Sequence, residues 1–110
     1  MKLPRRRIAA LIPLAFIVAA PSIARPAQTS AAVAIKNFAF TPQLLTVHPG
    51  TTVTWTNTDD EPHTVTSATK AFGSGALDTG GTYRFTFTRP GEYAYYCALH
   101  PHMTGKIIVK

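Results

Sequence analysis

The sequence has 110 residues but contains a single cysteine, Cys97, and few acidic residues. One cysteine cannot form a disulfide within the chain, so a small domain held together by disulfides is excluded. Only five Asp and Glu stand against eleven Lys and Arg. No paired carboxylates and no nucleophile–base pair point to hydrolytic or transfer chemistry, so we predict that the protein is not an enzyme.

The sequence also lacks an apolar run long enough to cross a bilayer. Its longest run, residues 8–20, is thirteen residues long, and about 20 are needed. A basic head precedes this run, and the small residues Ser22-Ile23-Ala24 follow it. The three parts are typical of a secretory signal, so we predict a signal peptide over residues 1–24, cleaved after Ala24. An uncleaved membrane anchor is the alternative.

Cleavage would change the charge of the protein. Residues 2–7 hold four of the eleven basic residues, so seven would remain against five acids and the net charge would fall from +6 to +2. No basic patch interleaved with aromatic residues would be left, so a nucleic-acid partner is not expected. Export predicts a periplasmic protein with no membrane attachment after cleavage.

The remaining chain reads as strands and turns. We interpret residues 25–32 as a flexible leader and residues 33–110 as one domain. The stretches "TVTWTN" and "TYRFTFT" alternate apolar and polar residues, which is typical of strands with one buried face. Turn-forming stretches such as "HPG" and "RPGE" separate the apolar runs, and the irregular segment 67–82 is expected to form a loop or a short helical turn. Seven or eight short strands predict an all-β sandwich or a small barrel.

The C-terminal stretch "YYCALHPHMTG" concentrates soft ligand atoms in the spacing C-x2-H-x2-M, with Cys97, His100 and Met103. A loop between two strands can turn three side chains with this spacing toward one point. His63, in "DDEPHTVTS", is the candidate for a second imidazole. Two His, one Cys and a weak axial Met are the donors of a blue-copper electron-transfer site, whereas zinc prefers Cys and His without a thioether. The pattern therefore predicts one copper ion.

Simpler interpretations exist for each residue. A lone cysteine is usually a small buried apolar side chain, and an adhesion-like β-sandwich with an incidental thiol would need no metal. His102 offers a C-x4-H alternative to His100 as the ligand. We expect His100 to be the ligand and His102 to lie exposed on the rim of the loop. Asp59 belongs to a short acidic run that is expected to be solvated.

The stretches "TTVTWTNTDDEPHTVTS" and "TYRFTFTRPGEYAYYCALHPHMTGKIIVK" resemble the cupredoxins, the type 1 blue copper proteins that include plastocyanin, pseudoazurin and azurin. The short ligand loop, with a proline directly after its histidine, is most similar to the amicyanins. The resemblance implies a Greek-key β-sandwich of seven to eight strands. It also implies a single type 1 copper ion, with the ligands His63, Cys97, His100 and Met103.

The sequence departs from the family pattern at two positions. Thr64 follows the first histidine where the family usually has Asn, whose side chain ties the two ligand loops together. We expect the Thr64 N–H to donate to the Cys97 sulfur but the side-chain tie to be weaker or absent. His102 precedes the methionine where the amicyanins have an apolar aromatic residue.

The resemblance and the donor set together predict a periplasmic one-electron carrier that cycles its copper between Cu(II) and Cu(I). A monomer is expected to dock briefly with redox partner proteins, a dehydrogenase or a cytochrome, through the patch around His100. The alternative is a periplasmic copper-binding protein for copper resistance, storage or delivery, which would use the same ligands.

Overall fold

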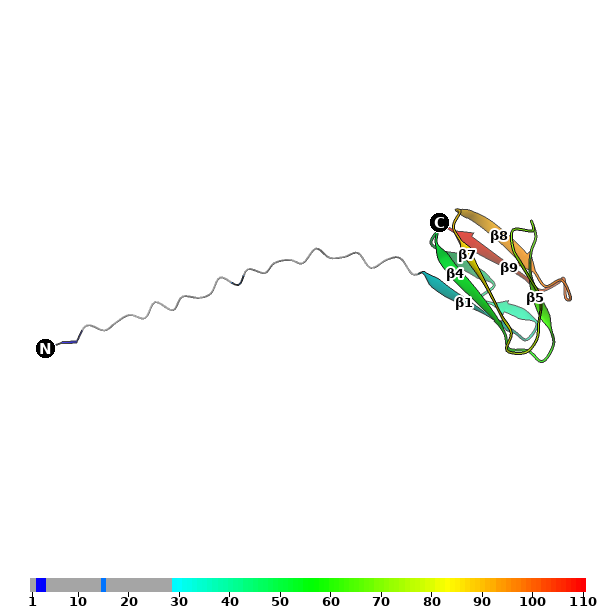
Figure 1. Cartoon of the computed structure of the whole chain (residues 1–110), viewed down its shortest axis with the longest axis horizontal. Helices are drawn as coiled ribbons and strands as arrows, with labels where there is room; N and C mark the ends of the chain where they lie inside the picture. Colours follow the sequence, from blue (N-terminus) through cyan, green and yellow to red (C-terminus); the bar gives the residue numbers. More distant parts are fainter. Residues whose placement is uncertain (1, 4–14, 16–28) are drawn as a thin grey trace.

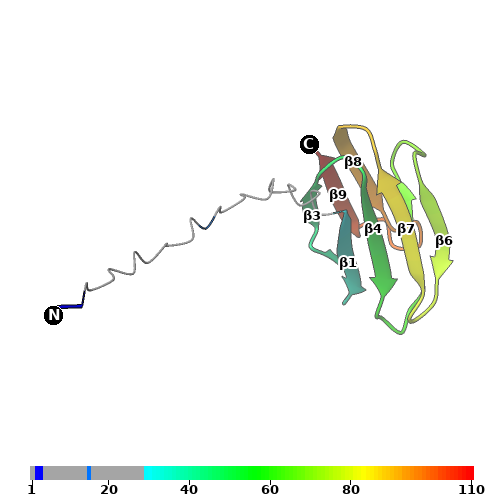
Figure 2. The ribbon, with the colours of Figure 1, turned by 60° about the vertical axis from the view of Figure 1, so that its left-hand side comes forward.

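A computed structural model describes residues 2, 3, 15 and 29–110 of the chain. Its described strands form two sheets that lie face to face (Figures 1 and 2). The four-stranded sheet has the order β2 (Ala39–Thr41), β1 (Ser30–Lys36), β4 (Thr51–Asn57), β7 (Thr82–Phe87). The five-stranded sheet has the order β3 (Leu44–Val47), β9 (Thr104–Val109), β8 (Gly91–Tyr96), β5 (His63–Ser67), β6 (Gly73–Leu77). The predicted all-β sandwich is confirmed, with nine described strands instead of seven or eight.

The boundaries differ from the sequence prediction at two places. Strand β1 begins at Ser30 and pairs with β4 from there, so the folded domain starts before Val33 and includes the last part of the predicted leader. Strand β6 lies in the segment 67–82, for which the irregular sequence suggested a loop or helical turn. Nearly all of the predicted signal peptide lies outside the described residues. Within the described residues, no helix is long and apolar enough to span a membrane.

The core between the sheets is aromatic. Trp55 on β4 and Tyr95 on β8 are almost fully buried and meet edge to face, with 5.5 Å between their ring centroids. The alternation of "TVTWTN" explains this placement, because Val53, Trp55 and Asn57 share the inner face of β4. Alternation on β9 likewise buries Ile107 and Val109.

The order of strands in the larger sheet brings the two predicted ligand segments together. Strands β5 and β8 are antiparallel neighbours, with Thr66 opposite Tyr96. The start of β5, which carries His63, therefore lies beside the end of β8, which leads directly into Cys97. Residues 34 positions apart in the chain thus meet at one end of the sandwich.

Candidate metal centre

His63 is fixed by the turn that precedes it. The buried Asn57 side chain donates hydrogen bonds to the carbonyls of Glu61 and Leu77, both at 2.9 Å, and accepts the Asp59 N–H at 3.0 Å. This bracing holds the loop between β4 and β5 against the end of β6. His63 then enters β5 with no exposed side-chain surface.

The second ligand segment is a tight loop between β8 and β9. The Cys97 N–H donates to the Met103 carbonyl at 3.0 Å, and the Met103 N–H donates to the His100 carbonyl at 2.9 Å. The His100 N–H donates back to the Cys97 carbonyl at 3.2 Å. These backbone hydrogen bonds close the seven-residue loop. They fix the backbone positions from which its three soft side chains extend.

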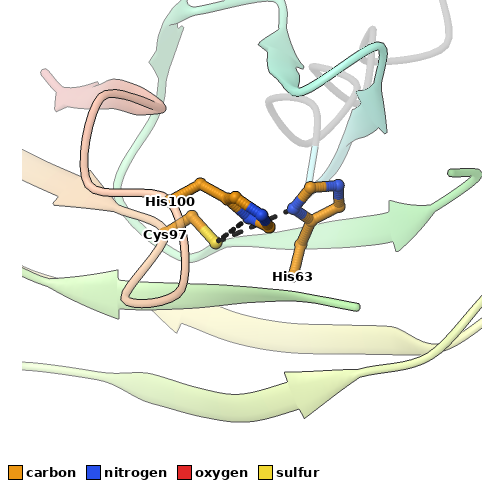
Figure 3. Close-up of side chains that lie close together, drawn as sticks. All are labelled: His63, Cys97 and His100. Carbon is orange, nitrogen blue, oxygen red and sulfur yellow. Dashed lines mark hydrogen bonds between the residues drawn. The ribbon is translucent and has the colours of Figure 1, made fainter. Parts of the chain in front are cut away.

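Three donor atoms converge at this end of the sandwich (Figure 3). The Cys97 sulfur lies 3.8 Å from His63 Nδ1 and 3.6 Å from His100 Nδ1, and all three ligand atoms lie within 4.8 Å of one another. Metal–nitrogen distances near 2.0–2.1 Å and metal–sulfur distances near 2.3 Å place trigonal donors roughly 3.8 Å apart. The spacing therefore fits one ion held by all three donors.

His100 is more exposed to solvent than the other three donor residues. Cys97 and His63 are fully buried, and Met103 is nearly so. His100 is only half-buried. Two imidazoles and a thiolate, with the thioether of Met103 on the same loop as Cys97, form the donor set of a type 1 copper site, which zinc does not favour.

A family model described as "Cupredoxin-like domain" matches residues 8–109 of the chain. The chain belongs to the cupredoxin family. It is 40% identical to the amicyanin of Paracoccus denitrificans over 75 residues, which cover 64% of this chain and 56% of that protein. It is 37% identical to the chloroplastic plastocyanin of Chlamydomonas reinhardtii over 84 residues, covering 64% and 58%.

Solved structures agree with this assignment. The structure of the Cu(I) form of an amicyanin mutant matches with a TM-score of 0.70 and 31% identity, covering 76% of this chain and 85% of that one. The chain thus has the cupredoxin fold and is a copper-binding, amicyanin-like cupredoxin. The chain spans little more than half the length of the two curated relatives named above. The amicyanins and plastocyanins that the chain resembles are non-enzymatic electron carriers, in agreement with the prediction that the protein is not an enzyme.

Thr64 contacts the second ligand loop of this cupredoxin site at two atoms. As predicted, its N–H donates to the Cys97 sulfur, at 3.3 Å. A side-chain tie is nevertheless present, because Thr64 Oγ1 accepts the Ala98 N–H at 2.7 Å. A hydroxyl on a short β-branched side chain reaches the backbone of the second ligand loop directly, so the two loops remain tied together without Asn.

His102 lies where the sequence placed it. It is exposed on the rim of the loop, and the cluster of donor atoms contains His100 instead. Pro101 separates the two histidines and is itself exposed. The C-x4-H alternative therefore has no support among the described residues.

Asp59 was expected to be a solvated acid, but it contacts the site directly. His63 Nε2–H donates to Asp59 Oδ2 at 2.8 Å, and a carboxylate only accepts, so His63 presents the lone pair of Nδ1 toward Cys97. The N–H of Phe38, above all, and those of Asn37 and His63 hold the pKa of Asp59 below its usual value of 3.8, against the opposing effect of its burial. Its position four residues before His63 is the only sequence signal for this contact.

Phe38 is a further residue that the sequence analysis missed. Its ring centroid lies 5.1 Å from that of His63 and 5.0 Å from that of His100, with interplanar angles of 89° in both pairs. The residue belongs to the turn between β1 and β2, far from the ligand motifs in the sequence. An apolar residue in a short polar turn is the only hint that the sequence offers.

Proposed function

We propose that this cupredoxin is a periplasmic one-electron carrier with a single type 1 copper ion, held by His63, Cys97, His100 and Met103. The observation that carries the proposal is the convergence of two imidazole Nδ1 atoms on one buried thiol sulfur. Met103 is buried and its backbone bonds to Cys97, which supports it as the weak axial ligand.

The protein's own residues support rapid electron transfer. Copper bound by these donors supplies a one-electron couple between Cu(II) and Cu(I). The closed loop from Cys97 to Met103 and the Thr64 tie hold the donors in one arrangement, so little has to move between the two states. The Thr64 N–H donates to the sulfur and stabilises its thiolate form.

Partner proteins are proposed to approach at His100. It is the only one of the four ligands that is not buried, and the exposed apolar residues Leu99 and Phe38 lie beside it, at 51% and 49% exposure. A small apolar surface of this kind suits brief encounters between redox proteins. A dehydrogenase or a cytochrome is the expected class of donor or acceptor.

The periplasmic location rests on the sequence of residues 1–24. A basic head, an apolar run and a small-residue cleavage site are typical of an exported chain. Mass spectrometry of the protein recovered from cells tests this part, since cleavage after Ala24 fixes the mass of the mature chain. A full-length mass would contradict it.

A visible spectrum of the purified protein with added copper tests the function. We expect an intense charge-transfer band from the Cys97 thiolate to Cu(II), lost on reduction and regained on reoxidation over many cycles. The variant Cys97→Ser should lack the band, because the sulfur donor is gone. Tight Cu(I) binding without reversible cycling would contradict electron transfer and favour copper storage or delivery.

A further inference from the structure

The turn between β1 and β2 has an unusual backbone. Lys36 pairs with Ala39, so Asn37 and Phe38 form a two-residue connection, and both have positive φ angles of 51° and 56°. Such turns favour glycine at the second position, and a bulky aromatic residue there is a conformational outlier. A left-handed conformation costs about 1–2 kcal/mol for a residue with a side chain. The turn therefore keeps Phe38 at a local cost in stability.

The ring of Phe38 occupies the space beside both copper-binding imidazoles. The centroids of Phe38, His63 and His100 form a triangle with sides of 5.0, 5.1 and 4.9 Å. Phe38 is half-exposed, whereas His63 behind it has no exposed surface. The ring thus covers His63 on the side that faces solvent and lies beside His100, which remains partly exposed.

The carboxylate of Asp59 fixes this ring in place. Its Oδ1 accepts the Asn37 N–H at 2.7 Å, and its Oδ2 accepts the Phe38 N–H at 2.9 Å. The same Oδ2 accepts the His63 Nε2–H at 2.8 Å. One side chain therefore holds both the ligand and the turn whose ring covers that ligand.

We propose that Phe38 is a positioning residue that shields the copper ligands from small solutes, and that Asp59 holds it over them. The proposal rests on the proposed copper site. A shielded ion exchanges electrons through His100 but does not take up a fourth strong ligand from solution. The aromatic ring provides the shield, and the backbone of the turn does not. This explains why the turn keeps Phe38 in a conformation that suits glycine better.

The first experiment needs no metal. Cys97 is the only cysteine, and iodoacetamide alkylates it when the thiolate sulfur displaces iodide. In the apoprotein we expect Phe38→Gly to speed alkylation by about tenfold or more, equivalent to about 1.4 kcal/mol of lost protection. The control Leu44→Ala removes an apolar side chain that is 59% exposed and outside the ring cluster, and should leave the rate unchanged.

Melting of the same apoproteins separates shielding from packing. Glycine relieves the strain at φ 56° while it removes the ring, so Phe38→Gly should melt close to the wild type. Faster alkylation with an unchanged melting temperature supports shielding. A melting temperature lowered in step with faster alkylation, or no change in rate, would overturn it. Phe38→Asn, whose residue type tolerates this conformation, provides the same comparison if the glycine variant does not fold.

The copper-loaded protein provides the second experiment. Azide added to the Phe38→Gly protein should change its charge-transfer spectrum at a concentration at least about tenfold lower than for the wild type. Asp59→Ala should act in the same direction because the turn loses its anchor, whereas Asp60→Ala, an exposed neighbour, should not. Equal azide sensitivity of wild type and variants overturns the shielding role. A wild type without the copper spectrum instead refutes the proposed function.

Discussion

Thr64 contributes to the site at two atoms, and a substitution of its side chain tests one of the two contacts. Its N–H donates to the Cys97 sulfur, and its hydroxyl accepts from Ala98. A side-chain substitution removes only the second contact. The backbone contact to the Cys97 sulfur remains. A substitution can therefore test the link between the loops without removing the hydrogen bond that stabilises the thiolate.

Thr64→Val should lower the free energy of unfolding of the apoprotein by about 1–3 kcal/mol, because the shape is kept but the Ala98 N–H loses its acceptor. Urea denaturation followed by fluorescence measures this change. Thr66→Val is the matched control. It removes the hydrogen bond between the Thr66 and Thr64 hydroxyls but leaves the contact from the Ala98 N–H to Thr64 intact. Equal effects of the two substitutions would show that the loop tie contributes nothing.

The two residues that could not be assigned from the sequence contact each other and the site only in the folded structure. Asp59 and Phe38 lie 21 positions apart and are joined by a hydrogen bond from the turn to the carboxylate. Neither residue type marks a metal site by itself, and nothing in their spacing reveals the pairing of β1 with β2. The ligands were predictable because three of them share one short loop, where the spacing alone brings the side chains together.

The pairing of β8 with β9 requires a residue without a side chain opposite Tyr95. Gly105 lies opposite Tyr95, and a Cβ atom at Gly105 would collide with the tyrosine ring. The ring therefore uses the space that the glycine leaves free on the inner face of β9. This contact lies two residues from Cys97 on one strand and two from Met103 on the other.

Gly105→Ala should destabilise the protein by about 1–3 kcal/mol, since the buried Tyr95 ring would have to leave its packed position to make room for the added methyl group. Thermal melting of the apoprotein measures the effect. Gly73→Ala on β6 is the control, because a Cβ atom there meets nothing within 4 Å. A melting temperature that falls equally in both variants would point to the loss of backbone freedom at any strand glycine, and not to this collision.

The alternation of apolar residues predicted β4 and β7, because one face of each strand packs toward the core and the period of two is visible in the sequence. Strand β6, "GSGAL", was not predicted, since two glycines and a serine give no alternation and it pairs at the edge of the sheet. Tertiary pairing with β5 forms this strand where local preference does not.

The stability of the folded protein depends on pH through Tyr95. Burial raises the pKa of Tyr95 to about 12 from 10.0, against a smaller opposing effect of the Trp55 side chain, and no described residue makes a hydrogen bond of good geometry to its hydroxyl. The folded protein keeps this proton up to a higher pH than the unfolded chain does. The contribution to stability is therefore complete below pH 10 and is lost as the pH rises toward 12.

Unfolding in urea at pH 9 and at pH 11.5 should show a fall in stability, of which about 2 kcal/mol belongs to Tyr95. In Tyr95→Phe that part should disappear, and the variant should be no less stable than the wild type at pH 9, because the removed hydroxyl makes no hydrogen bond of good geometry to a described residue. Parallel pH profiles of the two proteins would contradict the assignment to Tyr95. All other side chains are the same in the two proteins, so the difference between the two pH profiles belongs to Tyr95.

Four side chains from two segments of the chain are proposed to enclose one copper ion. X-ray absorption at the copper edge of the loaded protein tests this proposal most directly. The predicted result is one short copper–sulfur distance from Cys97 and two copper–nitrogen distances from His63 and His100, with the short sulfur contribution absent in Cys97→Ser. A copper environment of nitrogen and oxygen alone in the wild type would contradict the proposal.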